Sequence, residues 1–458
     1  MVGLSFGSVA QAMPDARIDQ EIRPCFGLLL RPEVSRRCQA HHGHKGGAGL
    51  VRAPSTYIDC AYAYPGQISD TIARTWNGVT IYLTSSNGRG CRESVVINRD
   101  ARILGDPDRP VLFIEPLLLA PQGQPCIRMA PGLKVDIRGV SMAQDDGDRS
   151  ACILGQDDDL FVSRSDVSYS GASNVIALAG DSRLTIVDSR IVSRSQEAAI
   201  VTRGKLKFDR VNIGAAVIGV KAGLQEDSRI DNLTLVRLDD WTGSRRSASS
   251  AGLALMDIGP TQLVEISGLD VTGFSRGAYV AGGGEVSFIA PKFSQTDWAL
   301  LVEGPTVRVS KASINAQEVG IYAASGTTFI NGADITGVMR SGIFAERGAQ
   351  VRSVDNVVHA PKEGCAALKS GYFDGALTCR PWFDAPELGG GKDRAILPTY
   401  DSLRKALDDE SRRLYAQEPH APKSVVGPGT RPAKHGRVST KRKAPIPYRG
   451  SVQGGPAR

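Results

Sequence analysis

Three segments decide the fold of this chain: EVSFIAPKF (285–293), TVRVSKASI (306–314) and TTFINGADI (327–335). Each has an apolar residue, a short polar or small-residue turn, and a second apolar residue five positions later. The same arrangement occurs upstream in RLTIVDSRI (183–191) and KLKFDRVNI (205–213). A unit that recurs at intervals of roughly 22 residues indicates a solenoid, in which each repeat packs only against its neighbours.

Aligned segments give two columns of apolar residues. Members of the first column follow one another at steps of 25, 24, 22, 22, 36, 22, 21, 21 and 23, and the second column lies five residues earlier. A third strand follows in segments such as VGIYAASG (319–326). Three stacked strands per coil predict an all-β parallel β-helix of about ten coils, from about residue 95 to 375. The first column is Met142, Val167, Ile191, Ile213, Leu235, Val271, Phe293, Ile314, Ile335 and Val358; the second runs through Ile186, Phe208, Ile230, Ile266, Phe288, Val309 and Ile330.

Glycine closes each third strand. Gly282, Gly304, Gly326 and Gly348 follow one another at intervals of 22 residues, and Gly204 has the same place upstream. Glycine adopts positive φ without a steric penalty and permits close backbone approach. We therefore expect these residues to form corners of the solenoid.

An amphipathic segment precedes the first strands. GQISDTIARTW (66–76) places Ile68, Ile72 and Trp76 at helical spacing, and the strand VTIYL (79–83) follows. With this helix and the columns, residues 60 to 380 resemble the right-handed parallel β-helix proteins of the pectate-lyase-like superfamily. The resemblance implies that the helix caps the first coil. The resemblance rests on the repeat pattern alone, because the sequence matches no catalytic signature of that superfamily.

The sequence predicts four parts: a disordered N-terminal segment (1–55), the β-helix (56–385), an amphipathic helix region (386–420) and a disordered basic tail (421–458). The first part contains either a signal-peptide remnant or an ordinary flexible terminus. In the helix region, Leu403, Leu407 and Leu414 share one face.

The positive charge of the chain is concentrated in its tail. The net charge is +7, but residues 423–458 hold nine Lys or Arg and no acidic residue, which leaves about −2 elsewhere. The tail is expected to bind polyanions. Nucleic acid is not the expected partner, because no base-reading module is present, and no apolar segment reaches the ~18 residues of a membrane span.

Eight cysteines permit a disulfide framework. Cys126 and Cys152 have the same place before successive third strands, so they should lie ~4.8 Å apart, within disulfide reach. Cys365 and Cys379, at the closing end, form the second predicted pair. Disulfides persist in oxidising compartments, so we expect a secreted or periplasmic protein.

Residues that precede the first column should point outward, because side chains alternate along a strand. Asp270 and Lys292 lie one coil apart on this outward stripe, and Arg190 and Asp166 lie on it further upstream. Lyases and epimerases of acidic polysaccharides need such groups: one neutralises the sugar carboxylate and another abstracts the C5 proton. The alternative is a solvated polar face. The stripe runs through Ser141, Asp166, Arg190, Asn212, Thr234, Asp270, Lys292, Ser313, Asp334 and Asn356.

Aromatic residues suggest binding surfaces for sugar. Tyr279 and Tyr322 share an outward stripe of the third strands with Val201, Leu301 and Phe344. This stripe is either a platform for sugar rings or a packing surface for the C-terminal helix.

The one long coil provides a second candidate binding surface. Its insertion carries Trp241, Arg245 and Arg246, which are candidates for substrate binding unless the insertion only reflects drift in loop length.

No cofactor is required by these residues. Two acidic runs, 145–148 and 157–159, have the oxygen ligands that calcium prefers, but aspartate is also common in turns. The histidines of HHGH (41–44) are a weaker transition-metal candidate. No metal site is predicted.

These observations predict an exported β-helix protein that binds or modifies a polysaccharide, with lyase or epimerase as the candidate activities. The expected polysaccharide is acidic and carries uronate groups. The alternative is a non-catalytic structural or adhesive solenoid of the cell envelope. Fold alone does not decide between them.

Overall fold

A computed structural model describes residues 55–105, 116–144, 150–238, 250–346, 348–360, 364–369 and 371–380. The predicted N-terminal segment, helix region and basic tail lie outside the described residues, apart from residue 55. So does the loop that contains Trp241, Arg245 and Arg246.

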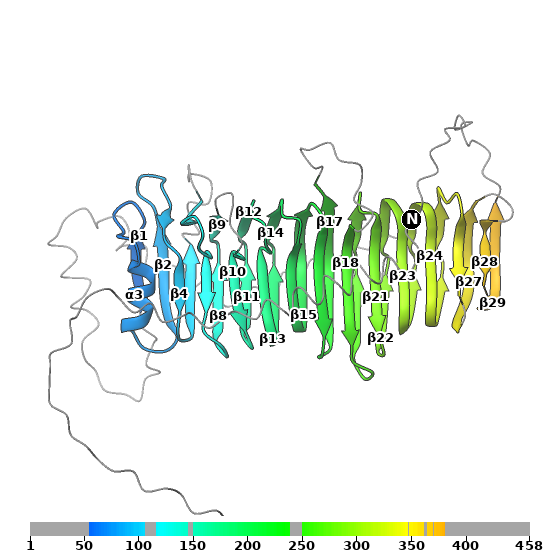
Figure 1. Ribbon diagram of the computed structural model, residues 1–458, viewed down its shortest axis with the longest axis horizontal. Coiled ribbons are helices and arrows are strands. Elements are labelled where there is room, and N and C mark those ends of the chain that lie inside the picture. The colour runs from blue at the N-terminus through cyan, green and yellow to red at the C-terminus, as the bar shows by residue number, and fades with distance from the viewer. Residues whose placement is uncertain are drawn as a thin grey trace, which may run out of the picture. The chain divides into compact units, whose positions relative to one another are not determined.

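The described chain is a β-solenoid whose strands pair only in parallel, each with its equivalent in the next coil (Figure 1). The pairings form three stacks. We call their outer surfaces the first-column face, the second-column face and the third-strand face. The strands are β1 (Ser55–Asp59), β2 (Val79–Thr84), β3 (Cys91–Arg92), β4 (Val95–Ile97), β5 (Ala101–Gly105), β6 (Leu118–Ala120), β7 (Ile127–Met129), β8 (Lys134–Arg138), β9 (Ser141–Gln144), β10 (Ile153–Gln156), β11 (Asp159–Ser163), β12 (Asp166–Tyr169), β13 (Ile176–Val187), β14 (Arg190–Ser193), β15 (Ala198–Ala215), β16 (Ile218–Leu224), β17 (Ser228–Arg237), β18 (Ala251–Ile258), β19 (Leu263–Ser267), β20 (Asp270–Thr272), β21 (Arg276–Gly282), β22 (Glu285–Ile289), β23 (Lys292–Ser310), β24 (Ser313–Asn331), β25 (Asp334–Thr336), β26 (Ser341–Ala345), β27 (Ala349–His359), β28 (Ala366–Leu368) and β29 (Tyr372–Arg380).

Both predicted columns are present in full register. Each member of the first column pairs with the next, including Leu235 with Val271 across the long coil. The second column is paired in the same way from Ile186 to Ile330. Column residues are buried and form one continuous core. Burial of these apolar side chains stabilises the fold at roughly 25 cal/mol per Å² removed from water.

The prediction of about ten coils is wrong, since the solenoid has about 13. At the N-terminal end the first column continues through Leu118 to Cys91, and at the C-terminal end Val358 pairs with Cys379. In the outermost coil at each end, cysteine takes the place of the aliphatic column residue, so these two coils do not match the sequence pattern.

Left-handed residues recur in the turns that lead into the strands of the first-column face. Arg164, Asp188 and Arg210 have φ of 48°, 48° and 53°, each two residues before an outward stripe position. The same offset from Asp355 (φ 53°) places Val357 on the stripe, paired with Asp334. The assignment of Asn356 to the stripe is therefore wrong. Its side chain is fully buried inside the turn, where it accepts a hydrogen bond from the Ala333 backbone N–H (2.7 Å).

The corner glycines have the expected backbone. Gly204, Gly282, Gly304, Gly326 and Gly348 have φ of 107°, 135°, 100°, 81° and 87°. A Cβ on Gly204 would lie 2.2 Å from the Ser182 carbonyl oxygen of the preceding coil, so close backbone approach also requires glycine there.

The single described helix, α3 (Gln67–Arg74), lies beside the first coils (Figure 1). Ile68 and Ile72 are buried as expected, but the helix stops before Trp76 because Thr75 is extended, and Trp76 is exposed. Glu93, from the next coil, accepts hydrogen bonds from the backbone N–H groups of Ile68 (3.0 Å) and Ser69 (2.9 Å). A carboxylate at this position satisfies free N–H groups of the helix N-terminus. That the helix caps the solenoid stays a prediction.

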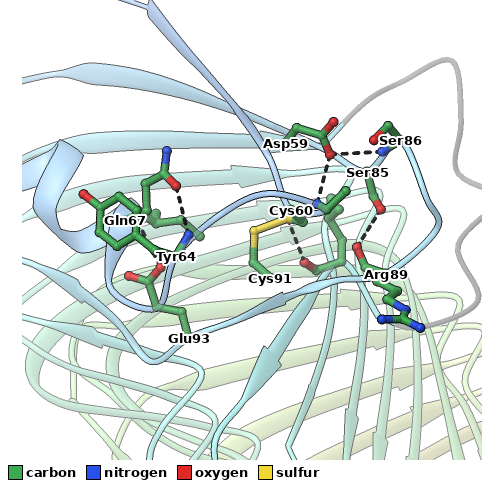
Figure 2. Close-up of a disulfide and its surroundings, with 12 residues drawn as sticks. Asp59, Cys60, Tyr64, Gln67, Ser85, Ser86, Arg89, Cys91 and Glu93 are labelled. Carbon is green, nitrogen blue, oxygen red and sulfur yellow. Dashed lines mark hydrogen bonds between the residues drawn. A yellow bond between two sulfur atoms is a disulfide. The ribbon is translucent and has the colours of Figure 1, made fainter.

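Three disulfides cross-link the described coils. Cys126–Cys152 and Cys365–Cys379, both predicted, have Cα–Cα distances of 4.6 and 5.9 Å. Cys60–Cys91, near α3, is a third (4.5 Å; Figure 2). In the part of the chain that the structure describes, no helix has the length and hydrophobicity of a membrane span.

Candidate functional site

The first-column face brings the four predicted catalytic residues together as two ion pairs. Asp270 pairs in register with Lys292, and Lys292 Nζ lies 3.4 Å from Asp270 Oδ2. Asp166 pairs with Arg190, with Nη1 3.5 Å from Oδ2. The register places both pairs on one stripe, with Asn212 and Thr234 between them.

These pairs face solvent. Side-chain exposure is 36% for Asp270 and 58% for Lys292, and 51% and 67% for Asp166 and Arg190. Exposed ion pairs contribute only about 0–1 kcal/mol to the stability of a folded protein. Stabilisation of the fold is therefore a weak explanation for the presence of these two pairs. Both signs of charge are open to a ligand, the ammonium for a carboxylate and the carboxylate for a hydroxyl or a proton.

Both tyrosines of the third-strand stripe are buried, whereas Phe344 and Val201 are half-buried. Tyr279 and Tyr322 retain 7% and 5% of their exposure, and Leu301 between them retains 1%. The Tyr322 ring stacks on Phe344, with centroids 5.2 Å apart, and the Tyr279 hydroxyl donates to Glu303 (2.8 Å). Rings this buried do not form an open platform in the described structure. The alternative partner, the predicted C-terminal helix, lies outside the described residues, and a role of Tyr279 and Tyr322 in substrate binding stays a prediction.

Two charged groups of this region are also withdrawn from water, Arg276 almost fully and Glu318 in part. Arg276 is 2% exposed, and burial lowers the pKa of its guanidinium to about 10. Burial raises the pKa of the Glu318 carboxyl, an effect that nearby Asp297 strengthens and Arg340 opposes. Desolvation disfavours the charged form in each case.

The acidic run 157–159 serves the backbone. Asp158 is 1% exposed and accepts hydrogen bonds from the N–H groups of Leu133 (2.8 Å) and Gln156 (2.7 Å). Asp157 accepts one from Asp181 N–H (2.9 Å). Within the described ranges no three His, Cys, Asp or Glu side chains are grouped to hold a metal ion, and the run 145–148, the second half of the calcium candidate, lies outside those ranges.

The second-column face carries a set of contacts that the sequence reasoning missed. Arg138 lies over the Phe161 ring (4.9 Å) and Arg308 over Phe329 (4.8 Å). The Arg138 contact joins residues of adjacent coils, as does a bond between Arg102 and Asp136 (3.1 Å). The alternation that identified the first-column stripe would have found these residues, had it been applied to the strands of the second column.

The fold places the chain among the parallel β-solenoids. In a comparison with known proteins, no protein-family model, curated protein or solved structure matches the chain.

Proposed function

We propose that the protein is an exported β-helix of the pectate-lyase-like type that binds an acidic polysaccharide. One observation carries the proposal: the exposed pairs Asp270–Lys292 and Asp166–Arg190 lie in register on one outward stripe. A regular stripe on stacked strands suits an extended polymer. The three disulfides are consistent with a secreted or periplasmic location.

Modification of the polymer by a lyase or epimerase reaction is the extension of this proposal. Lys292 would neutralise a uronate carboxylate, and Asp270, 3.4 Å away, would accept the C5 proton. Asp166 and Arg190 would repeat the arrangement at the second pair.

A structural or adhesive solenoid is the second candidate, and one observation favours it. Within each pair the two charges already neutralise each other, and the described residues contain 27 Lys or Arg and 27 Asp or Glu, so they carry no net charge. A neutral, internally paired surface is suited to a scaffold.

A panel of uronate-containing polymers tests the proposal, with binding and turnover measured separately on the full chain. If the protein is an enzyme, Asp270→Asn and Lys292→Ala should each lower turnover by on the order of 10²-fold, the usual effect of losing a proton-transfer group. Ser313→Ala, next on the stripe, is the matched control and should retain turnover.

Binding without turnover supports the binding function alone. A wild-type protein that neither binds nor alters any polymer of the panel overturns the carbohydrate proposal and leaves the structural solenoid.

A further inference from the structure

Charge is unevenly distributed along the second-column face. From β5 to β15 the outward positions of this face carry more cations than carboxylates, while from β17 to β29 the carboxylates are slightly in excess. In the first half the cations are Arg102, Lys134, Arg138, Arg183, Lys205 and Lys207, and the carboxylates are Asp136, Asp159 and Asp209. In the second half the cations are Arg229, Arg308 and Arg352, and the carboxylates are Asp231, Glu265, Glu285 and Asp374.

The excess of positive charge in the first half arises in part where two cations share a single carboxylate. Asp136 accepts from Arg102 (3.1 Å) and from Arg138 (2.8 Å), and these guanidinium side chains are 48% and 38% exposed. One carboxylate neutralises only one of the two cations. The planar guanidinium has five N–H donors, so each also has donors left for a second acceptor.

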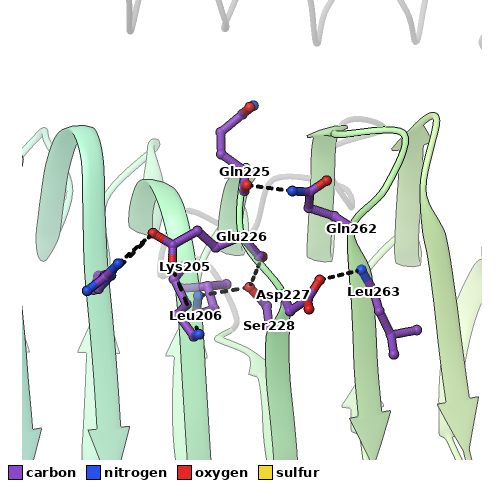
Figure 3. Close-up of polar contacts among 9 residues, drawn as sticks. Lys205, Leu206, Gln225, Glu226, Asp227, Ser228, Gln262 and Leu263 are labelled. Atoms are coloured by element: carbon purple, nitrogen blue, oxygen red, sulfur yellow. Dashed lines mark hydrogen bonds and ion pairs between the residues drawn. The ribbon is translucent and has the colours of Figure 1, made fainter.

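A second shared carboxylate, Glu226, lies in the turn before β17, outside the outward positions counted above, and contacts two cations of the first half. Glu226 lies 3.0 Å from Arg183 and 3.9 Å from Lys205, and these two cations are neighbours in register. Figure 3 shows Glu226 beside Lys205. Figure 3 also shows how the turn is held, since Asp227 accepts a hydrogen bond from the Leu263 N–H (2.9 Å) and Gln262 donates to the Gln225 carbonyl (2.8 Å).

Aromatic rings accompany these cations. Tyr57 and Tyr82 stack at the start of the face, with centroids 4.7 Å apart and planes 13° apart, and Tyr57 is 44% exposed. Along the same column, Tyr82 is followed by Leu104 and then Arg138, which lies over Phe161. Two stacked rings therefore begin the face, and a guanidinium–ring contact follows two coils after Tyr82.

We propose that this half of the second-column face, from Tyr57 to Lys207, is a binding site for a chain of acidic sugars. The inference rests on the proposed function for the class of ligand and assigns it a different surface. Seven strands at a spacing of ~4.8 Å make the site about 29 Å long, enough for several sugar rings.

Each component of the site matches one feature of such a ligand. Guanidinium groups bind carboxylates in bidentate geometry, and aromatic rings pack on the apolar surface of sugar rings. Asp136 and Asp159 accept hydrogen bonds from hydroxyl groups. A nucleic acid, with a negative charge every ~1.7 Å of duplex, would be repelled by these interspersed carboxylates.

The test measures calorimetric binding of polygalacturonate and alginate oligomers to the full chain. Tyr82→Ala and Arg138→Gln should each weaken binding about tenfold. Phe329→Ala and Arg308→Gln, which alter the equivalent cation–π pair in the other half of the face, are matched controls and should change binding less than threefold. Circular dichroism and thermal unfolding confirm that every variant is folded, and Tyr82→Phe, which keeps the ring, should retain binding.

The outcomes separate this inference from the proposed function. If the wild type binds and the Tyr82 and Arg138 variants match the controls, the inference is wrong while the proposed function stands. If Lys292→Ala alone abolishes binding, the site is the first-column stripe and the inference is again wrong. No binding of either oligomer overturns the inference, and the proposed function falls with it only if no polymer of the panel binds. Stronger binding of a single-stranded nucleic acid than of the oligomers overturns the choice of ligand.

Discussion

Asp158 illustrates how a single polar residue is fixed by stacked coils. Its carboxylate holds the N–H of Leu133 in the preceding coil and that of Gln156 in its own, and it is almost fully buried. Burial raises the pKa of this carboxyl, and the two backbone hydrogen bonds oppose that rise only partly. An acidic run that resembled a calcium ligand set therefore has a structural use.

The raised pKa predicts a pH dependence of stability. Between the ordinary pKa of aspartate and the raised one, the folded state holds a proton that the unfolded state has released, so the free energy of unfolding falls as pH rises. This contribution is fully present below the unfolded pKa and is lost as pH rises through the folded pKa. We expect the stability advantage of the wild type over Asp158→Asn, measured by denaturant unfolding, to shrink from pH 4 to pH 7. An advantage that grows over this range would contradict the assignment.

At the scale of the strand, the glycine inside the third strands makes room for the first column. A Cβ on Gly277 would lie 2.3 Å from the Phe293 ring, and one on Gly252 would lie 2.4 Å from Val271. Gly320 and Gly342 stand in the same relation to Ile335 and Val358. The large column residues thus fill space that a neighbouring strand leaves empty, and interiors packed this closely tolerate little added volume.

Gly277→Ala should therefore lower the free energy of unfolding by about 1–3 kcal/mol, the usual cost of overpacking. The matched control is Gly223→Ala, also in a buried strand, whose Cβ would meet its nearest atom at 3.6 Å and should change stability by less than about 0.5 kcal/mol. Adding Phe293→Val to Gly277→Ala should recover part of the loss, and a double-mutant cycle measures the coupling. Additive effects of the two substitutions would show that the ring is not the obstacle.

At the scale of the whole molecule, disulfides tie neighbouring coils in addition to their parallel pairing and side-chain contacts. Cys126–Cys152 closes a loop of 26 residues, and Cys60–Cys91 closes one of 31. Cross-links of this size stabilise a protein mainly by reducing the entropy of its unfolded state, typically by 2–4 kcal/mol.

Replacement of both Cys126 and Cys152 by serine should lower the free energy of unfolding by about 2–4 kcal/mol while the β-sheet circular dichroism spectrum is retained. A peptide map under non-reducing conditions should show the linked peptides in the wild type. Free thiols at both positions in protein isolated under oxidising conditions would refute the pair.

The tail provides a further prediction at this scale. Residues 423–458 hold nine Lys or Arg and no acidic residue, whereas the described residues carry no net charge. Deletion of 423–458 should make binding of acidic polymers less sensitive to salt, because exposed charges act through a screened field. Titrations at low and high ionic strength measure this effect. An unchanged salt dependence would mean that the tail takes no part.

The sequence by itself determined the repeating part of this protein: the two columns, the corner glycines, the Cys126–Cys152 pair and the juxtaposition of Asp270 with Lys292. These features depend on a local alternation that recurs at a nearly constant interval, so counting along the chain gives their place in space. Tertiary structure alone decided the contacts between residues whose separation differs from the repeat interval of about 22 residues. Glu93 accepts a hydrogen bond from the N-terminus of a helix 25 residues away, and Asp136 pairs with Arg102, 34 residues away. Variable turn lengths set such separations, and a turn's length does not follow from the pattern of the strands that it joins.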